Sequence, residues 1–282
     1  MAAMAIRNIK LTVSYDGLNY SGWQYQHGKR TIQGQLQQAI GELTGIFVKV
    51  KGASRTDAGV SALGQVANFF IDSPVPTENF VKALNHRLGR DIVVTEAVDA
   101  EKTFEASSFA KRKLYRYVIF TGKNPNVLKT RNCWHRPRKL DAAAMAAGAK
   151  MLVGTYDFKS FASASDKREN TTRTIFRCDV YSSCVVRDAS CEKKEMDSCF
   201  RRNDNTQYAI HNTQYENKWV NIEIEGDGFL HNMVRNIVGT LVEIGRGRWK
   251  PEKIKQIIQA KARTAAGPIA PAEGLCLIRI EY

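Results

Sequence analysis

Residues 52–60, GASRTDAGV, hold the side chains of this sequence with the clearest chemical potential. A glycine-bearing loop presents Arg55 and Asp57 two residues apart, between two segments that are expected to be strands. An opposite charge close by favours the ionised carboxylate, and an ionised carboxylate is able to act as a nucleophile or a base. Asp also caps tight turns by accepting hydrogen bonds from neighbouring backbone N–H groups. The local pattern alone leaves both an active site and a structural turn open.

The other reactive residue types give no indication of a metal or a nucleotide cofactor. No P-loop or dinucleotide fingerprint occurs in the sequence, and no C-x-x-C pair is present. The cysteines have neither the spacing of a zinc site nor that of a secreted disulfide framework; they are Cys133, Cys178, Cys184, Cys191, Cys199 and Cys276. We therefore expect no metal, no cofactor and reduced thiols.

Charge is the most informative bulk property. Lys and Arg total 42 against 28 Asp and Glu, which gives a formal net charge of +14. Residues 101–140 hold eleven Lys or Arg against Glu101 and Glu105, with six aromatic residues among them. A mixture of cations and aromatic rings suits a surface that binds phosphates and stacks bases. This distribution favours a nucleic-acid partner over a generally basic, soluble surface.

Periodicity predicts the elements that position the loop. In the first half, apolar residues alternate in strands and recur every three to four residues in helices. The expected order is a strand over 6–15, a helix from Thr31, strands near 47–53 and over 65–71, a helix from Thr77 and a strand over 92–98. This order is βαββαβ, and the Arg55–Asp57 loop lies between its second and third strands.

The second half repeats the order. The expected elements are a strand over 114–120, a helix over 141–153 closed by Gly154, strands near 173–181 and 219–226, a helix over 230–244, an extra helix from Pro251 and a strand over 275–282. Two such units predict an α+β protein of two ferredoxin-like halves, 1–105 and 106–282, with a central cleft. The sequence leaves two arrangements open: the sheets of the two halves are continuous, or they face each other.

Residues 182–216 interrupt this pattern. The segment is mostly polar, lacks sustained periodicity and falls where a short hairpin would join two strands. We interpret it as an insertion and not as a metal site, because the spacings of its three cysteines and His211 are irregular and wide. The N-terminal residues do not resemble a signal peptide, and no segment has the length and apolarity of a membrane span. A cytoplasmic protein is therefore expected.

Several motifs in order resemble the tRNA pseudouridine synthase A family over nearly the whole chain. Residues 52–69, GASRTDAGVSALGQVANF, closely resemble the family signature, in which the Asp is the nucleophile. The other matching segments are YDGLNYSGWQYQ (15–26), FEASSFAKRKLYRY (104–117), FLHNMVRNIVGTLVEIG (229–245) and AEGLCLIRIEY (272–282). Departures from the family pattern include Ser61, Ser107 and Lys113, which stand where His, Arg and Arg are usual.

The resemblance implies an isomerase that converts uridine to pseudouridine in the anticodon stem-loop of tRNA (positions 38–40), as a homodimer and without a cofactor. It places the catalytic carboxylate on Asp57, with Arg55 and Arg235 keeping it ionised and oriented. It also places substrate contacts on Tyr115 and Leu275. The site of attack, on the sugar, on the base or on the 2′ proton, stays open. A related synthase with broader RNA targets and a non-catalytic RNA-binding module of the same fold are the alternatives.

Overall fold

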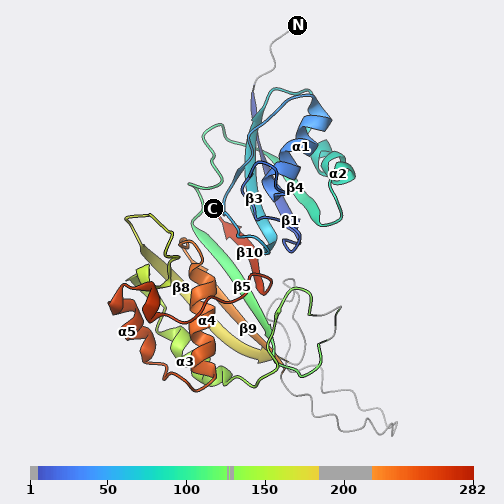
Figure 1. Ribbon diagram of the computed structural model, residues 1–282. Helices are drawn as coiled ribbons and strands as arrows, with labels where there is room; N and C mark the ends of the chain where they lie inside the picture. The colour runs from blue at the N-terminus through green and yellow to red at the C-terminus, as the bar shows by residue number, and fades with distance from the viewer. Residues whose placement is uncertain (1–5, 126, 128–129, 184–217) are drawn as a thin grey trace, which may run out of the picture.

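The computed structural model describes residues 6–125, 127, 130–183 and 218–282 (Figure 1). Its strands are β1 (Arg7–Tyr15), β2 (Lys51–Gly52), β3 (Ser61–Ile71), β4 (Ile92–Ala100), β5 (Arg112–Phe120), β6 (Trp134–His135), β7 (Gly154–Asp157), β8 (Thr172–Ser183), β9 (Trp219–Gly226) and β10 (Leu275–Glu281). Its α-helices are α1 (Ile32–Thr44), α2 (Thr77–Arg87), α3 (Ala142–Lys150), α4 (Met233–Gly245) and α5 (Lys253–Ala260). Two short 3₁₀ turns follow β7 and α5, at Lys159–Phe161 and Arg263–Ala265.

All strands of this described part belong to one mixed sheet. The strand order is β4-β1-β3-β10-β5-β9-β8-β7, with β2 paired to β3 and β6 paired to β5. In the first half the order is β4-β1-β3-β2, and in the second half it is β10-β5-β9-β8. These two orders are equivalent when each half is numbered from its own first strand. The duplication predicted from the sequence is therefore present in the topology of this α+β fold.

The two halves meet where the last strand inserts into the middle of the sheet. β10 pairs in parallel with β3, Cys276 opposite Ser61, and antiparallel with β5, Leu277 opposite Tyr115. The sheet is therefore continuous, which decides between the two arrangements that the sequence allowed. The junction places the start of β3, directly after the Arg55–Asp57 loop, beside the start of β10.

Helix boundaries follow from local chemistry. The Thr31 hydroxyl accepts a hydrogen bond from Gly34 N and begins α1, and Gly45 ends that helix with a left-handed backbone (φ 72°). Helix α4 is the most deeply embedded, because it carries Ile237, Val238 and Leu241 into the core with no exposed surface. It packs beside α3, on the second half of the sheet (Figure 1). Its embedding fixes where its N-terminal turn points.

Some predicted boundaries were wrong. The strand expected near 47–53 is only Lys51–Gly52; residues 46–50 form an irregular connection after α1 that still packs Val48 and Val50 in the core. Helix α3 ends at Lys150, and Gly154 (φ 129°) begins the unpredicted strand β7. Ser182 and Ser183 belong to β8, so the insertion starts later than expected; the rest of it, 184–216, lies outside the described residues. The division at residue 105 stays a prediction.

Candidate active site

The Arg55–Asp57 loop is fastened to its surroundings on both sides. Gln65 of β3 clamps Ser54 by donating from Nε2 to its carbonyl (2.7 Å) and accepting its N–H at Oε1 (3.2 Å). Thr56 accepts a hydrogen bond on its carbonyl from Trp23 N (3.0 Å), and its hydroxyl bonds to the hydroxyl of Tyr15 (2.8 Å). These contacts use the backbone and the residues beside Asp57. They leave the Asp57 carboxylate free to face outward.

The turn itself needs glycine at two places. Gly59 has φ +81°, a conformation that favours glycine, and lets Val60 N return to the Asp57 carbonyl (3.1 Å). Gly22 packs against the loop backbone so closely that a Cβ would lie 2.7 Å from the Thr56 carbonyl oxygen. The loop is therefore held in one shape by sterics as well as by hydrogen bonds.

Arg235 holds the Asp57 carboxylate from the first turn of α4. Its Nη1 lies 3.3 Å from Asp57 Oδ2 and 3.0 Å from Asn232 Oδ1, and its Nε donates to the Ala270 carbonyl (2.8 Å). Asn232 adopts the left-handed backbone (φ 62°) at the start of the helix, which directs its side chain toward the arginine. The guanidinium is only 16% exposed, so the ion pair is stronger than a surface pair would be.

His231 is a residue of this site that the sequence analysis did not predict. Its Nε2 lies 3.5 Å from Asp57 Oδ1, the oxygen opposite to the one that Arg235 contacts. Its backbone N–H donates to Asp166 Oδ2 (3.0 Å). Arg168 beside Asp166 holds the pKa of that carboxyl well below its ordinary value. A signal in the sequence was its spacing: His231 precedes Arg235 by four residues, and residues four apart at a helix lie on the same side.

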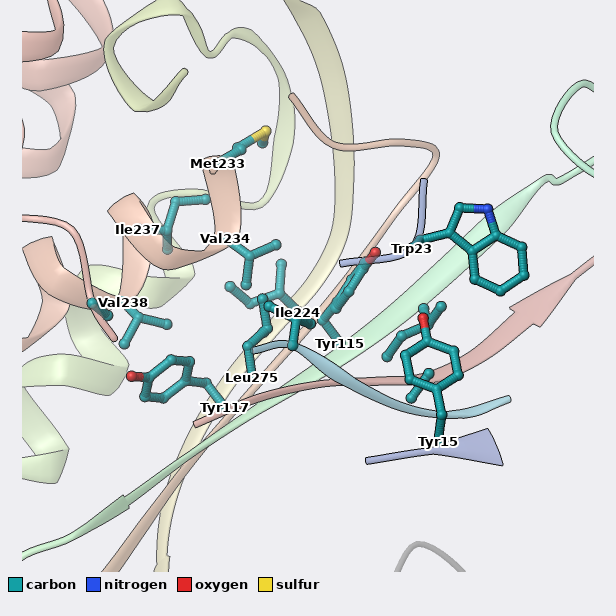
Figure 2. Packing of buried hydrophobic residues seen from close by; sticks show 14 of the residues in the cluster. Tyr15, Trp23, Tyr115, Tyr117, Ile224, Met233, Val234, Ile237, Val238 and Leu275 are labelled. Carbon is teal, nitrogen blue, oxygen red and sulfur yellow. The ribbon is translucent and has the colours of Figure 1, made fainter. Parts of the chain in front are cut away.

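Tyr115 and Leu275 form the apolar wall beside the carboxylate. Figure 2 shows Tyr115, Leu275 and Val234 close together where α4 lies over β5 and β10. The Tyr115 ring packs edge-on against Phe229, 5.2 Å between centroids, and its hydroxyl bonds to Ser54 (2.8 Å). Burial raises the pKa of Tyr115 to about 12, so it is a neutral phenol at ordinary pH.

These groups line one cleft of about 1280 Å³ between the two halves. The first half contributes residues around the Asp57 loop, together with Ser21, Gln24 and Gln26, and Ser107 lies just after the predicted division between the halves. The second half contributes Lys113, Tyr115, 165–168, 229–235 and Leu275. The cleft combines an ion-paired carboxylate, an aromatic ring and an apolar side chain. It is suited to hold a planar polar ring with the carboxylate at its edge.

Cations surround the mouth of this cleft. Arg55 is exposed and, within the described residues, has no ion pair. Lys113 donates to the Ala53 carbonyl (2.7 Å). Burial, with a contribution from Arg173 and Arg168, lowers the pKa of Lys113 to about 8. A polyanion entering the cleft would meet Arg55, Lys113 and Arg168, which line it.

The structure thus brings Asp57, Arg235, Tyr115 and Leu275 together, as the resemblance implied. Arg55 lines the same cleft but does not pair with Asp57, because its side chain points into solvent while Arg235 and His231 occupy the two carboxylate oxygens. The catalytic and binding roles of all five residues stay predictions.

The basic stretch 101–140 does not form one surface. Lys113 faces the cleft, whereas Arg116 pairs with Glu223 (2.8 Å) and Arg112 stacks on the Phe176 ring (4.5 Å). Alternation along β5 separates them, because successive side chains of a strand point to opposite faces. Among the described residues, no group of His, Cys, Asp and Glu has a geometry that could hold a metal ion. Cys184, Cys191, Cys199 and His211 lie outside those residues.

Known proteins of one family match nearly the whole chain. The family model described as tRNA pseudouridine synthase matches residues 11–109 and 148–282. The chain is 41% identical over 277 residues to tRNA pseudouridine synthase A of Acetivibrio thermocellus, covering 98% of this chain and 100% of the relative. It is 38% identical to tRNA pseudouridine synthase A of Clostridium kluyveri over the same shares.

One solved structure, a Cbf5-Nop10-Gar1 complex, matches 95% of this chain and 57% of its own at 11% identity and a TM-score of 0.33, too distant to support an argument. Within the described part of the chain, none of the helices has both the length and the apolarity needed to cross a membrane. On the family match and the two relatives, the chain belongs to the tRNA pseudouridine synthase family.

Proposed function

We propose that this protein isomerises uridine to pseudouridine in tRNA, with targets in the anticodon stem-loop and Asp57 as the catalytic carboxylate. The observation that carries the proposal is the Asp57–Arg235 ion pair, which joins the two halves at the floor of a cleft between them. Family membership supports the reaction. The anticodon stem-loop rests on the resemblance of the sequence to the synthase A family, and the name of the relatives, synthase A, is consistent with it.

The reaction conserves atoms. The bond between ribose C1′ and uracil N1 breaks, the base turns within the cleft, and a new bond forms between C1′ and C5. The proton on C5 leaves and N1 gains one, so no oxidant, reductant or group donor is consumed. The enzyme must therefore hold a detached base and exchange protons. These tasks need positioned side chains and exclusion of water.

The described residues divide these tasks. Asp57, held at Oδ2 by Arg235, is an oriented anion close to the place where a ribose would lie. Tyr115 offers its ring for stacking on uracil, while its hydroxyl is engaged by Ser54. Leu275 closes the pocket from the first residue of β10, next to Tyr115. A base reaches this depth only after it is flipped out of its stack.

Cations at the cleft mouth supply the affinity for the RNA backbone. Arg55, Lys113 and Arg168 line the cleft, and each neutralised phosphate releases counterions. We also propose that the protein acts as a homodimer in the cytoplasm, which rests on resemblance to the family. A non-catalytic RNA-binding module of the same fold would have no use for an aligned, half-buried carboxylate.

The test is the isosteric change Asp57→Asn. It removes the charge with little change in volume, so tRNA affinity and thermal stability should persist while turnover is lost. Tritium release from tRNA containing [5-³H]uridine measures turnover, and Asp72→Asn, an exposed Asp at the end of β3, is the matched control. Turnover by Asp57→Asn within about tenfold of wild type, a barrier change near 1.4 kcal/mol, would contradict the assignment.

A further inference from the structure

Four arginines gather at the C-terminal end of α4, away from the cleft. Arg246 and Arg248 each donate to the Glu243 carboxylate, at 2.8 and 3.0 Å. Arg136 and Arg138 come from the segment before α3, and Arg136 lies within electrostatic range of Arg138, Arg246, Arg248 and Glu243. The segments are tied together, because Asp141 N donates to the Gly245 carbonyl (2.8 Å). We call Arg136, Arg138, Arg246 and Arg248 the arginine cluster.

The cluster is remote from the catalytic carboxylate. Arg235 and Arg246 lie near opposite ends of α4, which Figure 1 shows as a continuous helix beside α3. At about 1.5 Å per residue they are roughly 16 Å apart along the helix axis. A ligand that occupied the cleft with a single nucleoside would not reach the cluster.

Structural roles account for only part of this charge. Arginines at a helix C-terminus interact favourably with its negative end, which is equivalent to about half a charge. Glu243 adds one negative charge, and the nearby Asp141 carboxylate caps α3 by accepting from Ala144 N (2.9 Å). Four guanidinium groups therefore exceed the negative charge around them.

Arg136 shows where that excess is unsatisfied. Its Nη1 is buried and has no hydrogen-bond partner, and among the described residues no other cationic side chain has such an atom. Its backbone is fixed by Arg136 N donating to the Phe120 carbonyl (2.7 Å), and its guanidinium lies 5.9 Å from the centroid of the Trp134 ring. A buried donor without a partner is costly and calls for an absent acceptor.

We propose that the arginine cluster binds backbone phosphates of the RNA substrate, at a second contact separate from the cleft. Guanidinium groups bind phosphate oxygens through paired N–H donors. Arg138 and Arg248 are exposed and are able to reach an incoming ligand. The inference rests on the proposed function, because the ligand that would span the roughly 16 Å from the cleft to this surface is the RNA whose nucleotide the cleft holds.

The test compares wild type with Arg136→Gln/Arg138→Gln, which leaves the Glu243 pairs intact. The dissociation constant for tRNA should rise about tenfold, and the slope of log affinity against log salt should become shallower by roughly one to two, since each phosphate contact contributes about 0.7 to 0.9. The turnover number at saturating tRNA should not change. Arg90→Gln, at an exposed arginine before the edge strand β4, is the control for the charge change.

The outcomes separate this inference from the proposed function. If wild type is active but the double variant has the same tRNA affinity and salt slope as wild type, the inference is overturned while the proposed function stands. The inference is also overturned if Arg90→Gln weakens tRNA binding as much as the double variant does. If the double variant does not fold, the exposed Arg138→Gln carries the same comparison. Thermal unfolding in the presence of inorganic phosphate alone distinguishes RNA phosphates from the free anion. If millimolar phosphate stabilises wild type but the double variant binds tRNA as tightly as wild type does, the site binds the free anion. That result would overturn the RNA contact.

Discussion

The imidazole Nε2 of His231 lies 3.5 Å from Oδ1 of Asp57, while Arg235 holds the other carboxylate oxygen at 3.3 Å. The carboxylate is thus bounded on two sides by residues from one short stretch of chain. His231 is half-exposed, whereas Arg235 is mostly buried. The arginine is therefore a fixed partner and the histidine a replaceable one.

This relationship predicts different results for two substitutions of His231. Gln keeps an N–H donor near Asp57 Oδ1, so His231→Gln should retain most activity. Leu removes the donor, and we expect His231→Leu to lose about tenfold in kcat, a barrier change near 1.4 kcal/mol for the loss of one polar contact to a carboxylate. Single-turnover tritium release is the measurement. Equal rates for wild type and both variants would mean that the contact has no catalytic consequence.

Lys113 predicts a pH dependence of RNA binding. Burial lowers its pKa to about 8, so the cleft loses a positive charge as pH rises through that value. Affinity for tRNA should fall between pH 7 and about 9 in wild type. Lys113→Arg, which keeps its charge throughout, should flatten this dependence. The dissociation constant at fixed ionic strength is the observable, and a parallel decline in both proteins would assign the titration to another group.

The same pKa predicts the direction of a stability effect. Between pH 8 and 10.5 the unfolded chain holds the Lys113 proton and the folded chain has released it, so this residue makes stability rise with pH. Lys113→Met, of similar length, removes the effect. The difference in Tm between Lys113→Met and wild type should shrink as pH rises through this window. A difference that stays constant or widens would show that the amine is not buried.

Tyr115 should be sensitive to loss of its ring more than to loss of its hydroxyl. Tyr115→Phe keeps the stacking surface and frees Ser54, and we expect kcat to fall by less than about tenfold. Tyr115→Leu should lose much more. Tyr117→Phe is the matched control, because it breaks a buried hydrogen bond to the Pro271 carbonyl (2.8 Å) outside the cleft. It should lower Tm and leave kcat unchanged; comparable kcat for Tyr115→Phe and Tyr115→Leu would refute stacking.

The chain between β8 and β9 should be replaceable. Ser183 and Trp219 are paired across the two antiparallel strands, so residues 184–217 connect strand ends that already lie together. A short Gly-containing turn would close the hairpin, and loop closure costs little entropy even for long connections. Tm and kcat should both stay near wild type. A deletion that unfolds the protein, or that removes a stoichiometric metal found by elemental analysis, would show that the segment is structural.

The sequence by itself determined the repeated order of elements and the importance of one loop. Apolar periodicity predicted both βαββαβ units because each strand and helix must bury one face, and that requirement is local. The motif around Asp57 was identified by its resemblance to the family signature, because the local pattern alone is also typical of a structural turn. Its partners in the sequence could be named only by resemblance, since Asp57 and Arg235 are 178 residues apart.

Tertiary structure decided which side chains meet. The parallel pairing of β10 with β3 brings the second half against the loop, and only then does Arg235 reach Asp57 while Arg55, two residues from it, points to solvent. His231 was not predicted, because its contact with Asp57 depends on how α4 packs against the sheet, and periodicity contains no information on that packing. The arginine cluster could not be predicted from the sequence for the same reason. Arg136 and Arg246 are distant along the chain, and their positive charges come together only when α4 packs against the segment before α3.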